Sequence, residues 1–263
     1  MGKSLVIAEK PSVASDIARA VGGFTRKDDY FENDDFVISS AVGHLLEITV
    51  PPENEVKRGK WTFAQLPHIP PDFDLKPISK TESRLKLLKR LIKRKDVDCL
   101  INACDAGREG ELIFRYIVQH AKSKKPVKRL WLQSMTKGAI QGGFDRLRDD
   151  DALIPLANAA ICRSESDWLV GINGTRAMTA FNSKSGGFQL TTVGRVQTPT
   201  LSLVVSRERL IRDFKPRKYD RITAKFGIHA GEYEGIYQRA NFKKKADDKD
   251  DRIDRIWDEE AAA

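Results

Sequence analysis

The chain has 263 residues, enough for one large domain or two smaller ones. Its hydrophobic fraction of 40% can supply a core, while its charged fraction of 32% exceeds the roughly one quarter usual in globular proteins. A net charge of +9 favours a polyanionic partner, with nucleic acid ahead of a membrane surface. No apolar run is long enough to span a bilayer, and charge comes too early at the start for a secretory signal.

The cysteines indicate the compartment. Cys99, Cys104 and Cys162 are odd in number and show no CxxC spacing. We therefore expect neither a disulfide framework nor a structural zinc site. We expect the protein to reside in a reducing cytoplasm.

The first strand-to-helix turn carries a charged pair. Residues 4–8 form a short apolar run of strand length, and a helical pattern covers residues 13–21. Pro11 suits the first turn of that helix. Glu9 and Lys10 therefore lie at the turn, either as a solvated pair or as part of a site.

The next segments are a strand, an excursion and a basic helix. Residues 35–42 predict a strand that ends at Gly43-His44, and His44 is either a structural group or a functional one. Residues 51–79 are rich in proline and predict an ordered excursion with little regular structure, held by Trp61 and Phe63. Residues 80–95 predict a strongly basic helix, whose charged side faces either solvent or phosphate.

A second strand-to-helix turn is strongly acidic. Residues 97–102 predict a buried strand, and residues 112–118 the start of a helix. Between them, Asp105, Glu109 and Glu111 place three carboxylates within seven residues. Mg²⁺ could hold such a cluster, because it prefers oxygen ligands, but acids also favour the positive end of a helix dipole. Two such turns on a parallel sheet would bring Glu9 close to Asp105 and Glu109.

The alternation of strands and helices continues through a strand at residues 127–132 and a helix to about residue 147. This pattern predicts one α/β domain with a parallel sheet flanked by helices over residues 1–150.

The pattern then changes to helices and ends in strands. Residues 152–182 are helical, and a loop leads through residues 191–200 into a helix ending near Arg212. Arg195, Gln197 and Thr198 are donor types that bind phosphate oxygens, or else they cap a helix start. Alternation from Tyr219 predicts the first strand of a β-rich region, and residues 253–263 a short helix.

Five segments in this order and spacing resemble the amino-terminal part of type IA DNA topoisomerases, most closely the bacterial topoisomerase III branch. They are VIAEKPS at residues 6–12, GHLLE at 43–47, DAGREGE at 105–111, DWLVG at 167–171 and VGRVQTP at 193–199. The resemblance implies a Toprim domain at residues 1–150, a helical domain that binds single-stranded DNA at 151–217, and the beginning of a β-rich gate domain at 218–263.

The resemblance also implies an activity, in which a tyrosine cuts one DNA strand, another strand passes through the gap, and the cut is resealed. Such chemistry needs cations to position phosphate and an acid to protonate the departing sugar oxygen. Glu9 and Lys10 match the family's catalytic residues, and Glu9, Asp105 and Glu109 its Mg²⁺-binding acids. The expected DNA-binding residues are His44, Arg108, Arg163, Arg176, Arg195, Gln197 and Thr198, with Trp168 packing nearby. The chain is expected to act as a monomer.

Two departures from the family pattern have consequences. Gly107 stands where a second aspartate is commoner, which predicts weaker metal binding or a one-metal site. None of the five tyrosines lies in a Tyr-x-Arg-Thr setting, so the nucleophile is expected beyond residue 263 and this chain alone is expected to bind DNA without cleaving it.

Two alternatives stay open. Another Toprim enzyme, primase-like or a nuclease, would use a metal without a tyrosine, although the GRVQ segment at residues 194–197 and the helices before it argue against this. A non-catalytic fragment that binds single-stranded DNA would have the same sequence.

Overall fold

The computed structural model describes residues 2–50, 55, 60–184, 186–244, 248 and 250–257. Much of the first part of the predicted excursion, and residues 258–263 of the predicted last helix, lie outside these described residues. The chain divides into two compact units, Met1–Pro199 and Thr200–Ala263. The first unit thus joins the predicted Toprim domain to most of the predicted helical domain, because the long helix α5 (Ile154–Asn182) packs along α3 (Arg108–Ala121).

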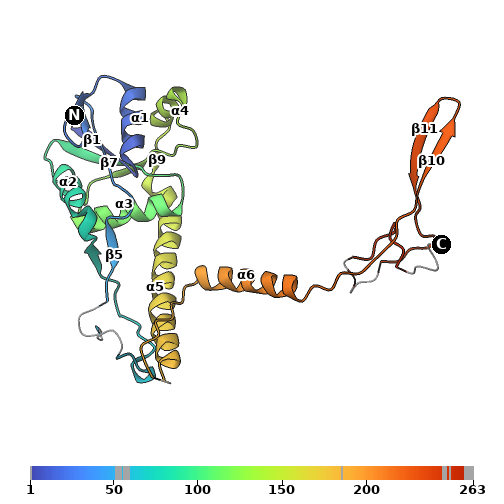
Figure 1. The fold of residues 1–263 in the computed structure, drawn as a ribbon. Coiled ribbons are helices and arrows are strands. Elements are labelled where there is room, and N and C mark those ends of the chain that lie inside the picture. Colours follow the sequence, from blue (N-terminus) through green and yellow to red (C-terminus); the bar gives the residue numbers. More distant parts are fainter. Residues whose placement is uncertain are drawn as a thin grey trace. The chain divides into compact units, whose positions relative to one another are not determined.

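A mixed sheet forms the centre of the first unit (Figure 1). Its inner strands β4, β1, β7 and β8 are parallel, as predicted, while β2, β3 and β9 add antiparallel edges that the sequence pattern did not indicate. The strand order is β2 (Thr25–Arg26), β3 (Phe31–Glu32), β4 (Phe36–Ser40), β1 (Lys3–Ala8), β7 (Val97–Ala103), β8 (Val127–Arg129) and β9 (Arg148–Asp149).

Helices cover both faces of this sheet. Helices α1 (Pro11–Val21) and α4 (Lys137–Phe144) pack on one face, against side chains such as Val6 and Ile101. Helices α2 (Glu82–Ile92) and α3 pack on the other, against Leu5 and Leu100. Residues of β1 alternate between the two faces, so a continuous apolar run is what a strand buried on both sides requires.

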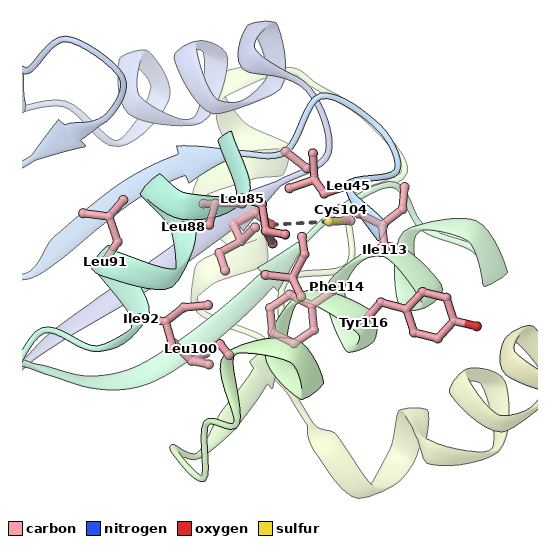
Figure 2. Close-up of a cluster of buried hydrophobic side chains, with 14 of the residues drawn as sticks. Leu45, Leu85, Leu88, Leu91, Ile92, Leu100, Cys104, Ile113, Phe114 and Tyr116 are labelled. Atoms are coloured by element: carbon pink, nitrogen blue, oxygen red, sulfur yellow. Dashed lines mark hydrogen bonds between the residues drawn. The ribbon is translucent and has the colours of Figure 1, made fainter. Parts of the chain in front are cut away.

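The cluster beneath α2 and α3 reaches the acidic turn (Figure 2). Cys104, which directly precedes Asp105, is buried in it, and its thiol donates to the carbonyl of Ile7 at 3.6 Å. Burial raises the pKa of the Cys104 thiol, which keeps its proton available for this contact. The apolar core therefore anchors the chain one residue before the first acid of the turn.

The proline-rich excursion packs on α5. It leaves β5 (Leu46–Ile48) and returns at β6 (Leu75–Pro77), which pairs with it in antiparallel fashion. The side chain of Asn173 exchanges hydrogen bonds with the backbone of His68, at 2.6 and 2.9 Å. Trp61 packs edge-on against Phe188, as predicted, whereas Phe63 leaves about half of its surface exposed (49%). Short 3-10 helices cover Phe63–Gln65, Ser79–Thr81 and Asp150–Leu153.

In the second unit, the strand predicted from Tyr219 has a partner. β10 (Thr223–Ile228) pairs with β11 (Gly231–Ile236) as an antiparallel hairpin. Helix α6 (Gln197–Arg212) precedes it along the chain. The predicted helix from residue 253 is wrong in its described part, because Ile256 forms a β-bridge with Asp220 instead. In the described part of the chain, no helix is long and apolar enough to cross a membrane.

Candidate functional site

Three chain segments meet at the carboxyl ends of the central strands. Ala8 of β1 pairs with Ala103 of β7 and with Ser40 of β4, so the residues that follow each strand emerge at one edge of the sheet. The backbone of Gly43 donates to the carbonyl of Glu9 at 3.3 Å, which joins the first turn to the third segment. This edge is where open α/β sheets hold their ligands.

Lys10 links the first turn to the acidic one. Its ammonium lies 3.0 Å from Oδ2 of Asp105 and 3.8 Å from Oε1 of Glu9. The hydrogen bond to Asp105, followed by the charges of Asp105 and Glu9, raises the pKa of Lys10. The predicted approach of Glu9 to Asp105 is confirmed, with Lys10 between them, while the predicted approach of Glu9 to Glu109 stays a prediction.

Glu9 has an unusual environment for a carboxylate. Its side chain is only 13% exposed, and its Oε2 is buried with no hydrogen-bond partner among the described residues. A buried carboxylate oxygen in this condition is available to a cation, because a buried charge needs a compensating partner.

The side chains at this edge carry the type of oxygen atom that Mg²⁺ prefers, but the described residues do not bring three ligands close together. Glu9 and Asp105 offer the hard oxygen ligands that Mg²⁺ prefers, and the free oxygen of Glu9 fits such a role. Among the described residues, however, no group of three histidine, cysteine or acidic side chains is close enough to hold an ion. The ammonium of Lys10 lies between the two acids.

Glu109 is placed by the start of α3. This helix begins at Arg108, four residues before the predicted start at Leu112, so Glu109 lies in its first turn, where the helix dipole favours an acid. Its Oε2 lies 3.3 Å from Nε2 of His44, and both side chains are exposed. Two predicted site residues from distant segments are thus brought together here.

The buried end of the acidic stretch was not predicted. Glu111 has no exposed surface and lies between Arg129, at 2.9 Å, and Arg115, at 3.3 Å. The amide of Asn102 donates to Glu111 at 2.9 Å. The signal in the sequence is a glutamate directly before an apolar helical run and an arginine inside the predicted strand at residues 127–132, since buried charges need partners.

An arginine-lined depression lies beside α5. It has a volume of about 420 Å³ and is bounded by Arg108, Arg163 and Arg195, together with Cys162, Ser166 and Val196. Asp167 accepts a hydrogen bond from Nε of Arg195 at 2.6 Å and lies 3.7 Å from Nε of Arg163. The bond from Arg195 lowers the pKa of Asp167. Three of the residues predicted to bind DNA therefore share one positively charged surface.

Two sequence-family models match the chain. The Toprim domain matches residues 4–135, about half of the chain, and a DNA topoisomerase family matches residues 152–263. The chain belongs to the type IA DNA topoisomerase family.

Curated relatives assign the chain to the topoisomerase III branch of this family. DNA topoisomerase 3 of Bacillus cereus is 40% identical over 260 residues, which is 97% of this chain and 34% of that protein. DNA topoisomerase 3 of Staphylococcus haemolyticus is 44% identical over 225 residues, 86% of this chain and 31% of that protein. The fold resembles full-length topoisomerase I from Thermotoga maritima, with a TM-score of 0.58, 22% identity, and coverage of 91% of this chain and 35% of that one. The chain thus spans about a third of the length of these relatives.

The remaining residues that the type IA resemblance singled out have other neighbours. Arg176 is buried, only 8% exposed, and lies over the ring of Trp61, a position that does not favour contact with DNA. The hydroxyl of Thr198 accepts a hydrogen bond from the backbone of Gly194 at 3.0 Å, and Gln197 is exposed at the start of α6. Trp168 packs edge-on against Phe73 and His68, which confirms the predicted packing role.

Proposed function

We propose that this chain provides the Toprim part of a topoisomerase III-type active site, which holds a single-stranded DNA phosphodiester with Mg²⁺ at the carboxyl ends of β1 and β7. The observation that carries the proposal is the position of Lys10 between Glu9 and Asp105, beside the unpartnered oxygen of Glu9. Together they place a cation and two acids at one point of the sheet edge.

Each side chain has a role in this proposal. Lys10 binds the scissile phosphate, for which its exposed ammonium is suited. Glu9 protonates the departing sugar oxygen and, with Asp105 and Glu109, provides oxygen ligands for the metal. Bound Mg²⁺ would neutralise and orient phosphate oxygens. The arginine-lined depression at Arg108, Arg163 and Arg195 binds the DNA backbone on either side of that phosphate.

Breaking the strand needs a nucleophile, which in this family is a tyrosine. None of the five tyrosines of this chain has the sequence setting of that residue. We therefore propose that the whole protein relaxes or decatenates DNA in the cytoplasm, and that the 263-residue chain by itself binds single-stranded DNA without forming a covalent tyrosyl intermediate.

Binding of a fluorescent single-stranded oligonucleotide, followed by anisotropy, tests this proposal. The chain should bind with an affinity that falls as salt rises, because arginine and lysine contacts to phosphate release counterions. Lys10→Met and Arg195→Met should each weaken binding. Arg19→Met is the matched control, since Arg19 is an exposed cation that pairs with Asp16 on α1.

Two results would contradict the proposal. One is an equal effect of the Lys10, Arg195 and Arg19 substitutions, which would mean that only net charge matters. The other concerns activity: relaxation of supercoiled plasmid by the isolated chain would show that its own residues supply a nucleophile. A Mg²⁺-dependent nick without a covalent intermediate would favour a nuclease of the Toprim class instead.

A further inference from the structure

A buried guanidinium lies directly beneath the acidic turn. Arg129 ends β8 and is only 1% exposed. Its Nη1 donates to the carbonyls of Asn102 and Cys104, at 2.8 and 2.7 Å, and its Nη2 donates to the carbonyl of Asp105 at 2.8 Å. One side chain thus binds the backbone of the last strand residues and of the first acid of the turn.

These contacts fix the direction in which Asp105 points. Its carbonyl is turned inward to Arg129, while its side chain, 52% exposed, reaches outward to Lys10. The inner side of the turn is also closely packed, because a Cβ at Gly110 would lie 2.1 Å from the carbonyl oxygen of Asp105. The side-chain oxygen of Asn102 also stabilises the turn, because it accepts a hydrogen bond from the backbone N–H of Cys104 at 3.0 Å.

The positive charge of Arg129 is balanced by the carboxylate of Glu111. Oε1 of Glu111 lies 2.9 Å from its Nε, an ion pair rather than an aligned hydrogen bond. Glu111 is in turn paired with Arg115, which binds Asp150 through two hydrogen bonds of 3.0 and 2.6 Å. The network therefore connects β7, β8 and α3 around the turn, and each buried charge has a partner of opposite sign.

We propose that Arg129 is a positioning residue, which sets the place of Asp105 in the metal and phosphate site through the backbone of the turn. The inference rests on the proposed function. Only arginine suits this place, because its planar fork supplies donors to three carbonyls at once, whereas lysine offers one compact ammonium. Because only 1% of its surface is exposed, Arg129 acts through the backbone of the turn and not by contact with substrate or metal.

Calorimetric titration of Mg²⁺ into the whole chain, with Arg129→Lys, tests the inference. The lysine keeps the positive charge, so Glu111 still has a partner, but it lacks the planar guanidinium that donates to the three carbonyls. We expect Mg²⁺ affinity to fall by about tenfold, the size of effect seen when groups that support metal ligands are changed. Amide hydrogen exchange over residues 103–111 should become faster, which reports the turn without any metal.

Arg94→Lys is the matched control. Arg94 is a partly buried arginine that pairs with Glu32 and Asp96 at the opposite ends of the strands. The Arg94→Lys substitution should lower the midpoint of urea unfolding without changing Mg²⁺ affinity or amide hydrogen exchange at residues 103–111. Glu111→Gln provides a second variant that keeps the shape of the network, and it too should weaken Mg²⁺ binding.

The outcomes separate the inference from the proposed function. If the unaltered chain binds no Mg²⁺, the proposed metal site is wrong and the inference fails with it. If that chain binds Mg²⁺ and the folded Arg129→Lys and Glu111→Gln variants bind it equally well, the positioning role is refuted while the proposed function stands. Loss of affinity in Arg94→Lys to the same extent would also refute it, since general destabilisation would then explain the result.

Discussion

The three carboxylates of the acidic stretch each meet a different nitrogen. Asp105 pairs with Lys10, Glu109 with His44, and the buried Glu111 with Arg129. This division explains how three acids can lie within seven residues, since each faces a different nitrogen-bearing side chain. Position 107, a glycine, is the position in the turn where a further side chain could be added without a contact to its Cβ.

Gly107→Asp is expected to strengthen Mg²⁺ binding. A Cβ added at this position would meet no described atom within 4 Å, and the backbone there is extended, a conformation open to any residue. An added carboxylate raises the charge of the ligand set, and we expect about tenfold tighter binding by calorimetry, or about 1.4 kcal/mol.

Gly107→Asn is the control for this change, since it has the same shape without the charge. Equal affinities for the aspartate and asparagine variants would contradict the prediction. Two tight Mg²⁺ sites in the unaltered chain would also contradict it, because the missing acid predicts weaker binding or a single site.

Sequence reasoning indicated the candidate residues at the two turns and missed the buried residues beneath them. Glu9 and Asp105 could be predicted because each follows an apolar strand-length run at a turn into a helix. Arg129 and Glu111 could not, because their pairing depends on the register of β7 with β8, in which Asn102 lies opposite Arg129. No local pattern encodes that register.

At the scale of elements, the close approach of α3 to the end of β7 shapes the turn. The helix begins at Arg108, directly after Gly107, and its first turn packs Gly110 against the backbone of Asp105. The sequence predicted the strand and the helix but placed the helix start four residues late, because the acids of the first turn were assigned to the loop. Charged residues in a first turn are compatible with a helix.

Gly110→Ala should therefore destabilise the chain. The added methyl would lie 2.1 Å from the carbonyl oxygen of Asp105, so the turn or the helix must move. We expect a loss of about 1–3 kcal/mol in urea unfolding, the usual cost of overpacking. Gly107→Ala adds the same methyl three residues earlier into open space, and it should be tolerated. Equal unfolding midpoints for the two variants would show that the turn is not packed in this way.

The opposite ends of the strands are held by a second charge cluster. Arg94 binds Glu32 and Asp96, and Lys3 binds Glu32 at 2.9 Å. The bond from Arg94 lowers the pKa of Asp96 from 3.8 to about 2, and a bond from Arg94 also lowers the pKa of Glu32. Because both values are depressed, this stabilisation is complete above about pH 4 and is lost as the pH falls toward 2.

Asp96→Asn should accordingly make the free energy of unfolding depend less steeply on pH under acidic conditions. Urea midpoints measured in steps from pH 5 to pH 2 should decline less steeply in the variant, since one of the two depressed carboxyls is gone. The effect is moderated by solvent, because the Asp96 side chain is half exposed. Parallel declines in both proteins would mean that the pair contributes nothing to acid stability.

At the scale of the whole molecule, the chain is about a third of the length of its curated relatives. The parallel centre of its sheet and the two-sided helical cover follow from the alternation of apolar runs and helical patterns. The antiparallel edges β2, β3 and β9 are only two residues long each, too short for a periodic signal. Helix α6 leaves apolar side chains exposed, among them Leu203 and Leu210, a feature typical of surfaces that contact other parts of a protein.

The proposed function depends on Glu9 and Asp105 acting on one cation, and a double-mutant cycle measures this directly. Mg²⁺ would be titrated calorimetrically into the chain, into Glu9→Gln and Asp105→Asn, and into the double variant. If the two carboxylates share an ion, each single change should weaken binding strongly and the double variant should lose much less than the sum. Single variants that bind Mg²⁺ as the unaltered chain does, or losses that simply add, would contradict a common site at the ends of β1 and β7.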